Sequence, residues 1–381
     1  MSKKMLVMIV AVVAIPVVAM LGCKPNKEAR ETPSLSIGAV LPLTGDAAQW
    51  GVGAQRGIQI AVDEVNAAGG IHGRKVMVIF EDDQLKPSVG TEAMQKLVTV
   101  NKVTVVIGSI SSSVTLSIAP IAEKSQVVLI SPASTSHDIT QAGDFIFRTI
   151  PSDIYEGGFM AKYAREKKSY HRIAILSVNA AGTKGMSDAF KETFIAEGGE
   201  ITLCELVPQG ATDFRATVSK AIGTDPQAFY VVGFPLETGH MIKQLVELGY
   251  KGQILSAQPA EDPEVLKIAG SAAEGLILTT TSIDPETGAA PTKAFVLEYR
   301  RRYKSNPAVF SYEAYDAARL VLQGMTAKGI NGPAIRDFLY GTRDYDGASG
   351  KFSFDKNGDV ETQIKILVIK NGQFELAPKQ L

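Results

Sequence analysis

The chain has 381 residues and a nearly balanced charge, with 39 Lys and Arg against 40 Asp and Glu. This length is enough for two domains of ordinary size, and a net charge of −1 provides no basic field for a nucleic acid. The four histidines do not occur at the spacing of a metal site. We therefore expect no nucleic-acid partner, no metal and no cofactor.

The N-terminus has the pattern of a bacterial export signal. Two lysines precede an apolar run over residues 5–21, and the small residue Gly22 comes before Cys23. The letters MLGC resemble a lipobox, in which the cysteine is acylated and becomes the mature N-terminus. We expect a lipoprotein signal peptide over 1–22, a lipid on Cys23 that holds the protein at a membrane, and a flexible leash over 23–34. Plain secretion and an uncleaved anchor are the alternatives.

After residue 34, short apolar runs alternate with helical patterns. This alternation predicts an α/β protein with parallel sheets covered by helices on both faces. The expected strands outnumber what one compact domain needs, so we expect two lobes. The expected strands are Ile37–Leu41, Lys75–Glu81, Val103–Gly108, Val127–Ser131, Arg172–Ser177, Glu200–Val207, Ala228–Val232, Gly252–Ser256 and Gly275–Thr280. The expected helices between them are Gly53–Asn66, Val89–Asn101, Ser112–Glu123, Tyr155–Lys167, Met186–Ala196, Asp213–Ile222 and Glu237–Leu248.

The last hundred residues have a different pattern. Helices are expected over Ala294–Tyr303, Tyr312–Ala327 and Pro333–Tyr340. The following stretch, FSFDKNGDVETQIKILVIKNGQFE, predicts paired strands joined by Asp/Asn-Gly turns, with a hairpin turn over Asp355–Asp359. A chain that returns in this way after two α/β lobes crosses between them several times.

The glycine-rich stretch LTGDAAQWGVGAQRG (residues 43–57) does not match a nucleotide-binding loop. Its spacing is Gly51-x-Gly53-x-x-x-Gly57, one residue too long for the dinucleotide fingerprint, and it begins too far from the strand. No phosphate-binding GxxxxGK[ST] or nucleophile motif GxSxG occurs. The pair Asp82–Asp83 predicts a turn at a strand end, because adjacent strand residues point to opposite faces. These patterns give no support to an enzyme.

Two hydroxyl-rich segments follow neighbouring strands, IGSISSSVT (107–115) and ISPASTSHD (130–138). Hydroxyls and free N–H groups at a helix N-terminus suit an anion such as a carboxylate. Ligands of open α/β sheets bind at the carboxyl edge of the strands. The other interpretation is that these residues only cap helices and form turns. The residues alone leave both interpretations open.

Seven longer stretches span most of the chain after residue 34. They read SIGAVLPLTGDAAQWG, GIQIAVDEVNAAGGIHGRKV, DDQLKPSVGTEAMQKLV, VVIGSISSSVT, SPASTS, FRTIPSD and AGSAAEGLILT. Together, from about Leu35 to about Val368, they resemble the periplasmic substrate-binding proteins of branched-chain amino-acid (leucine/isoleucine/valine) ABC transporters. The resemblance implies a type I periplasmic binding protein fold: two Rossmann-like lobes joined by three hinge crossings, which close around a ligand. The implied lobes are 35–152 plus 282–345, and 153–281 plus 346–381.

The resemblance also implies ligand-binding residues in the first lobe. In the family, the stretch matching Ala48–Gly51 is a pocket loop, and its aromatic residue, here Trp50, lies against the ligand's side chain. Ser112 matches the hydroxyl that binds the ligand carboxylate. Ala133 and Thr135 fall where backbone and side-chain groups bind the carboxylate and the amino group. Two neighbouring hydroxyl residues complete the expected set, Ser111 and Ser134.

The second lobe departs from the family pattern at three positions. Gly182 and Phe234 stand where the family commonly has pocket tyrosines, and Gln258 stands where it has an acidic residue facing the α-ammonium. The loss of a tyrosine at Gly182 is expected to enlarge the pocket for a bulkier or aromatic side chain. Three tyrosines are expected to line it, Tyr155, Tyr312 and Tyr315.

The neutral Gln258 cannot offset the charge of an ammonium group, because a neutral hydrogen bond is weaker than a charged one. Asp153 is the expected replacement. Glu237 and Glu261 are alternatives, and a further alternative is a ligand without an ammonium group.

The function that the resemblance implies is that of a receptor and not of an enzyme. We expect a monomeric, lipid-anchored protein in the periplasm or at the outer face of the cell membrane. It would deliver a small carboxylate, foremost an apolar branched-chain or aromatic amino acid, to the permease subunits of an ABC importer. The alternatives are a receptor for an aromatic or aliphatic carboxylate without an amino group, and a sensory module for a signalling partner.

Overall fold

The computed structural model describes residues 33–281, 288–360 and 362–377. The expected signal peptide, Cys23 and all but the end of the expected leash lie outside the described residues, as does the expected lobe crossing at residue 282. Residues Ser34–Leu381 form one compact unit. No helix in the described part of the chain is long and apolar enough to cross a membrane.

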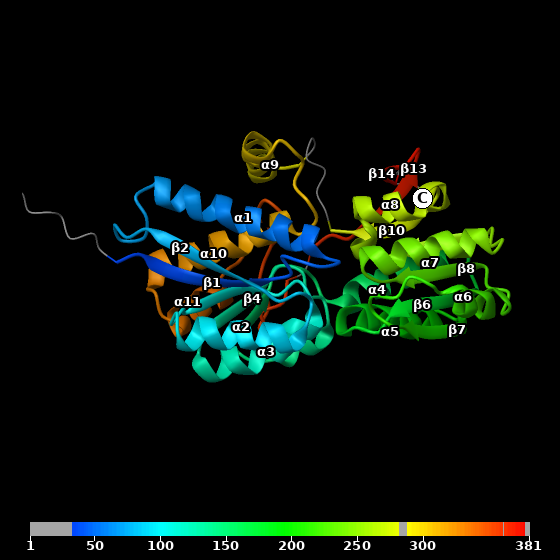
Figure 1. The fold of residues 1–381 in the computed structure, drawn as a ribbon, viewed down its shortest axis with the longest axis horizontal. Helices are drawn as coiled ribbons and strands as arrows, with labels where there is room; N and C mark the ends of the chain where they lie inside the picture. Colours follow the sequence, from blue (N-terminus) through cyan, green and yellow to red (C-terminus); the bar gives the residue numbers. More distant parts are fainter. Residues whose placement is uncertain (1–32, 282–287, 361, 378–381) are drawn as a thin grey trace, which may run out of the picture. The chain divides into compact units, whose positions relative to one another are not determined.

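The first sheet is entirely parallel. Its strands are β1 (Leu35–Leu41), β2 (Val76–Asp82), β3 (Val105–Gly108), β4 (Val128–Ser131) and β5 (Ile146–Arg148), and its helices are α1 (Ala48–Ala67), α2 (Pro87–Thr99), α3 (Ser112–Ser125), α10 (Ser311–Lys328) and α11 (Gly332–Tyr340). The strand order is β2-β1-β3-β4-β5. Helices α1, α10 and α11 cover one face, and α2 and α3 cover the other (Figure 1). Both faces of β1 are therefore buried: Ile37 and Leu41 pack toward α1, and Val40 packs toward α2 and α3. We call this sheet with its helices the first lobe.

The second sheet repeats this arrangement. Its strands are β6 (Arg172–Val178), β7 (Glu200–Val207), β8 (Ala228–Val232), β9 (Gln253–Ser256), β10 (Ile277–Thr280), β13 (Lys365–Lys370) and β14 (Gln373–Leu376), and its helices are α4 (Asp153–Lys162), α5 (Ala181–Ala196), α6 (Arg215–Ile222), α7 (Pro235–Glu247) and α8 (Pro263–Ala269). The order is β14-β13-β10-β9-β8-β6-β7. The strands from β6 to β10 are parallel, whereas β13 pairs antiparallel with β10 and with β14. We call this sheet with its helices the second lobe.

The five parallel strands of each lobe follow the same order, in which the first strand of the lobe lies between the second and the third. The first lobe reads β2-β1-β3-β4-β5, and the second reads β7-β6-β8-β9-β10. Ligands of such doubly wound sheets bind outside the carboxyl ends of the strands, where the order reverses. The predicted α/β class and two-lobed architecture are confirmed, and each lobe offers one such edge.

Helix α1 differs from its prediction in its starting point. It begins at Ala48 and not at Gly53, so Trp50 lies in the first helical turn and not in a loop as expected. The glycines of this stretch, which do not favour a helix, are required because neighbouring backbone atoms lie too close for a Cβ atom. A Cβ on Gly51 would lie 2.0 Å from the carbonyl oxygen of Pro42, and one on Gly57 would lie 2.3 Å from a carbonyl oxygen of α10. The glycine-rich stretch therefore brings α1 close to its neighbours and holds no phosphate loop.

The segment after α11 remains packed on the first lobe beyond residue 345, where the crossing was expected. The backbone N–H of Ala348, between β11 (Tyr345–Gly347) and β12 (Gly350–Phe352), donates to Asp316 of α10. The carbonyl oxygen of Gly358 accepts from the backbone of Arg148 on β5. We therefore propose that the chain crosses to the second lobe after Val360 and not after residue 345.

Candidate ligand-binding site

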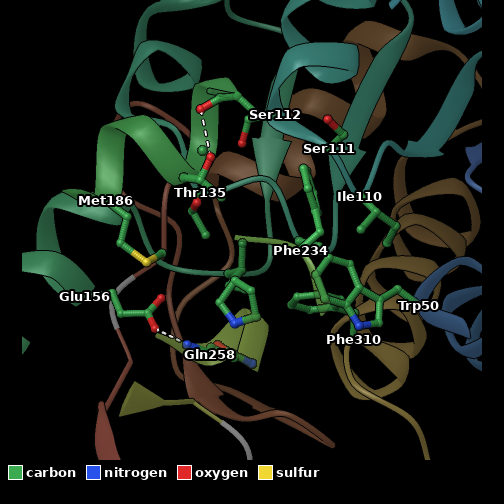
Figure 2. Close-up of a pocket in the computed structure, with 16 residues that line it drawn as sticks. Trp50, Ile110, Ser111, Ser112, Thr135, Glu156, Met186, Phe234, Gln258 and Phe310 are labelled. Atoms are coloured by element: carbon green, nitrogen blue, oxygen red, sulfur yellow. Dashed lines mark hydrogen bonds between the residues drawn. The ribbon is translucent and has the colours of Figure 1, made fainter. Parts of the chain in front are cut away.

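A cavity lies at the carboxyl ends of the strands and is lined by residues of both lobes. Aromatic side chains and Ile110 gather on one side of it, the hydroxyls of Ser112 and Thr135 lie at another, and Glu156 lies beside Gln258 (Figure 2). The lining residues are Trp50, Ile110, Ser111, Ser112, Ala133, Thr135, Ile150, Glu156, Ala180, Gly182, Thr183, Met186, Phe234, Gln258, Pro259 and Phe310.

The polar end of the cavity is built at the N-terminus of α3. Ser111 is the residue that precedes this helix, and Ser112 is its first residue. The first turn of an α-helix leaves N–H groups without intrahelical partners and carries a partial positive charge. The Ser112 hydroxyl oxygen accepts the backbone N–H of Ser136 at 3.2 Å, so its own proton remains available for donation. Together with Thr135, these groups offer donors to an anion.

A second row of hydroxyls supports this end from behind. Ser134 was expected to contact the ligand, but its hydroxyl lies within hydrogen-bond distance of the carbonyl oxygen of Ser109 at 2.9 Å and of Thr115 at 2.8 Å. Ser109 in turn donates to Asp83 at 2.6 Å. Burial raises the pKa of Asp83 to about 6. The predicted turn at Asp82–Asp83 is thus part of the scaffold that positions the loop after β3.

The apolar side of the cavity is an aromatic cluster. Trp50 packs against Phe310 with ring centroids 5.3 Å apart and against Phe234 at 5.9 Å. The indole Nε1 donates to Asp262 at 2.7 Å, and this carboxylate also accepts the backbone N–H of Glu264 and caps α8. The position of Phe310 was not predicted, because it comes from the turn before α10, far from the other pocket segments in sequence.

Among the described residues that line the cavity, Glu156 on α4 is the acidic side chain, and no motif in the sequence pointed to it. Its side-chain Oε1 accepts the backbone N–H of Gln258 at 2.7 Å and the hydroxyl of Thr279 at 2.5 Å. The side chain is 1% exposed, and burial raises its pKa even though these hydrogen bonds act in the opposite direction. The Gln258 amide oxygen accepts from Thr281 at 2.8 Å.

The two lobes approach each other closely around the polar end. The backbone N–H of Ala181 in α5 donates to Ser113 of α3 at 3.1 Å. A Cβ on Gly182 would lie 2.8 Å from the Ser112 hydroxyl oxygen and 3.2 Å from that of Thr135. Gly182 was expected to enlarge the pocket. It lines the cavity, and it also lets α5 approach α3, because a Cβ atom would meet these two hydroxyls.

Several residues expected at the site lie elsewhere. Asp153 is fully buried against α5, where a Cβ on Gly185 would lie 1.9 Å from its Oδ2, and burial raises its pKa to about 7. Tyr155 is 49% exposed, and Tyr315 donates to Glu64 on α1 at 2.9 Å. Three more residues that were expected near the ligand are not among the described residues that line the cavity: Tyr312, Glu237 and Glu261.

Comparisons with known proteins agree with this architecture. Residues 34–373 match the model of a periplasmic binding protein family. The Leu/Ile/Val-binding protein homolog 3 of Brucella melitensis is 27% identical over 86% of this chain and 89% of its own length. The crystal structure of the leucine-binding protein LivK of Thermotoga maritima is 30% identical, with a TM-score of 0.84 over 90% of this chain and 98% of that one.

A second solved structure is of the branched-chain amino-acid transporter substrate-binding protein LivJ of Streptococcus pneumoniae in complex with isoleucine. It is 29% identical and has a TM-score of 0.84 over 90% of this chain and 99% of that chain. These relatives are solute-binding proteins of transporters and not enzymes. With the two doubly wound lobes and the cavity lined by both, the family match shows that the chain belongs to the periplasmic binding proteins.

Proposed function

We propose that this protein captures an apolar α-amino acid, branched-chain or aromatic, and delivers it to an ABC importer. The observation that carries the proposal is a cavity with two unlike ends. Ser112 and Thr135 present hydroxyls beside the N-terminus of α3, and Trp50, Phe234 and Phe310 form an apolar wall. A carboxylate at the first end and an apolar side chain at the second would satisfy both. The isoleucine complex of the Streptococcus pneumoniae relative supports this ligand class.

The family implies an extracytoplasmic location. Within that location, we propose that a lipid on Cys23 tethers the protein to the membrane and that it acts as a monomer. The partners would be the permease subunits of the importer.

A receptor for a carboxylate without an amino group is the second candidate, because the neutral Gln258 lines the cavity. A thermal-shift panel separates the two. The protein lacking residues 1–23 would be unfolded and refolded to remove bound ligand. It would then be tested with leucine, isoleucine, valine and phenylalanine, and with their des-amino counterparts. A ligand at 100 times its dissociation constant stabilises the native state by about 2.7 kcal/mol, which gives a readable shift.

Ser112→Ala tests the placement of the carboxylate. It should weaken every ligand in the panel by roughly 10- to 150-fold, since a hydrogen bond to a charged group contributes about 1.5–3 kcal/mol. Ser117→Ala is the matched control, because Ser117 lies on the same helix and its hydroxyl donates to the Val114 carbonyl oxygen. A panel in which no carboxylate raises the melting temperature would refute the proposed function.

A further inference from the structure

The Glu156 carboxylate lines the cavity, and the hydrogen bonds that it accepts from described residues leave one of its oxygens without a donor. The side chain belongs to the first turns of α4, lines the cavity and points toward Gln258 (Figure 2). Both hydrogen bonds from described residues, those from Gln258 and Thr279, end on Oε1. Oε2 is therefore the oxygen left for a donor that enters with the ligand.

This carboxylate has no protein counter-charge among the described residues. The described residues that line the cavity include no Lys, Arg or His, and the groups that favour ionised Glu156 are the neutral donors of Gln258 and Thr279. Removing a carboxylate from water costs several kcal/mol unless a cation or several donors compensate. A buried acid without a cation, inside a cavity, is a candidate functional group.

The neighbouring Gln258 is poorly suited to hold an ammonium group. Its amide oxygen already accepts from Thr281, and its Nε2 is buried without a partner among the described residues. An NH₂ group only donates hydrogen bonds, so it cannot accept one from an ammonium group. Asp153, the expected replacement, lies outside the cavity lining. Among the described residues that line the cavity, Glu156 is the acidic side chain, and it lies beside Gln258.

We infer that Glu156 binds the α-ammonium group of the ligand through Oε2 and restricts the cavity to α-amino acids. The inference rests on the proposed function, in which the ligand's carboxylate occupies the end at Ser112 and Thr135. Ligand specificity then comes from three groups around one α-carbon: hydroxyls for the carboxylate, Glu156 for the ammonium and the aromatic wall for the side chain.

Calorimetric titration of refolded, ligand-free protein tests this role. Wild type and Glu156→Gln would each be titrated with leucine and 4-methylpentanoate, and with phenylalanine and 3-phenylpropanoate. The members of each pair differ only in the amino group. We expect Glu156→Gln to weaken the amino acids by roughly 10- to 150-fold, as for loss of a charged hydrogen bond, and to leave the des-amino acids equal or tighter. Asp153→Asn is the matched control on the same helix and should leave the ratio within each pair unchanged.

Two further variants keep a carboxylate in the cavity and thereby guard against a folding defect. Glu156→Asp withdraws the carboxylate by one methylene and should weaken only the amino acids. The double variant Glu156→Gln/Gln258→Glu moves the charge to the neighbouring position and should restore amino-acid binding.

The outcomes separate this inference from the proposed function. An unchanged ratio in Glu156→Gln, or the same loss in Asp153→Asn, would overturn the role of Glu156 while leaving amino-acid binding in place. A wild-type protein that prefers the des-amino acids would also overturn it. A wild-type protein that binds none of the four compounds would overturn both.

Discussion

One methyl group added at Gly182 tests whether the two lobes must approach closely when the ligand is bound. Its Cβ in Gly182→Ala would lie 2.8 Å from the Ser112 hydroxyl oxygen and 3.2 Å from that of Thr135. The two hydroxyls belong to the first lobe and Gly182 to the second, so the clash can be relieved only if α5 withdraws from α3 or the hydroxyls rotate. Overpacking of this kind costs roughly 1–3 kcal/mol. Because the cost falls on the ligand-bound, closed form, affinity should drop by roughly 5- to 150-fold.

The assay is calorimetric titration, combined with thermal unfolding of the ligand-free protein. Unfolding should show no loss of stability, because alanine is favoured over glycine in a helix by up to about 1 kcal/mol. Gly158→Ala is the matched control: it lies in helix α4, and its Cβ would meet only the Thr193 hydroxyl at 3.3 Å. Unchanged affinity in Gly182→Ala would refute the close approach of α5 to α3 in the ligand-bound form. So would an equal loss in the control.

Two other predictions concern groups farther from the polar end. Trp50→Phe keeps an aromatic ring but removes the Nε1 hydrogen bond to Asp262, which joins the two lobes. Surface plasmon resonance should show ligand dissociation roughly 10- to 150-fold faster, and an unchanged rate would contradict the role of this bond. Burial raises the pKa of Glu313 to about 8, so the folded state keeps a proton that the unfolded state loses above about pH 4.5. Wild type should therefore lose stability relative to Glu313→Gln as the pH rises from 5 to 8.5, by roughly a few kcal/mol in urea unfolding. Parallel losses in the two proteins would contradict this.

The fold was largely predictable because its strands are buried on both faces. Such strands appear as continuous apolar runs, and each of the nine expected strands corresponds to an observed one. The misses are short elements. β5 (Ile146–Arg148) has three residues and α8 (Pro263–Ala269) has seven, too few for a period to emerge. The start of α1 at Ala48 was not predicted because glycines disfavour a helix. Gly51 and Gly57 are needed there for close contacts with Pro42 and α10, and a local sequence pattern does not show such contacts.

The site was predictable where its residues follow strands directly, as Ser112 and Thr135 do. It was not predictable where pairing depends on tertiary contact. Glu156 and Gln258 are 102 residues apart in sequence and meet only because the fold brings α4 beside the segment that follows β9. One local signal was present: Glu156 lies on the buried face of α4 with Met160 and Ala161, where an acid is out of place unless it has a function. Asp153, three residues earlier, is turned instead toward α5.

A crystal structure of the complex with the amino acid that gives the largest thermal shift would locate both charged groups of the ligand. We predict that the ligand carboxylate lies within hydrogen-bond distance of the hydroxyls of Ser112 and Thr135. The ammonium nitrogen should lie within hydrogen-bond distance of Glu156 Oε2, and the side chain should lie against Trp50. A ligand bound in the reverse orientation, or with its ammonium group away from Glu156, would contradict this binding mode.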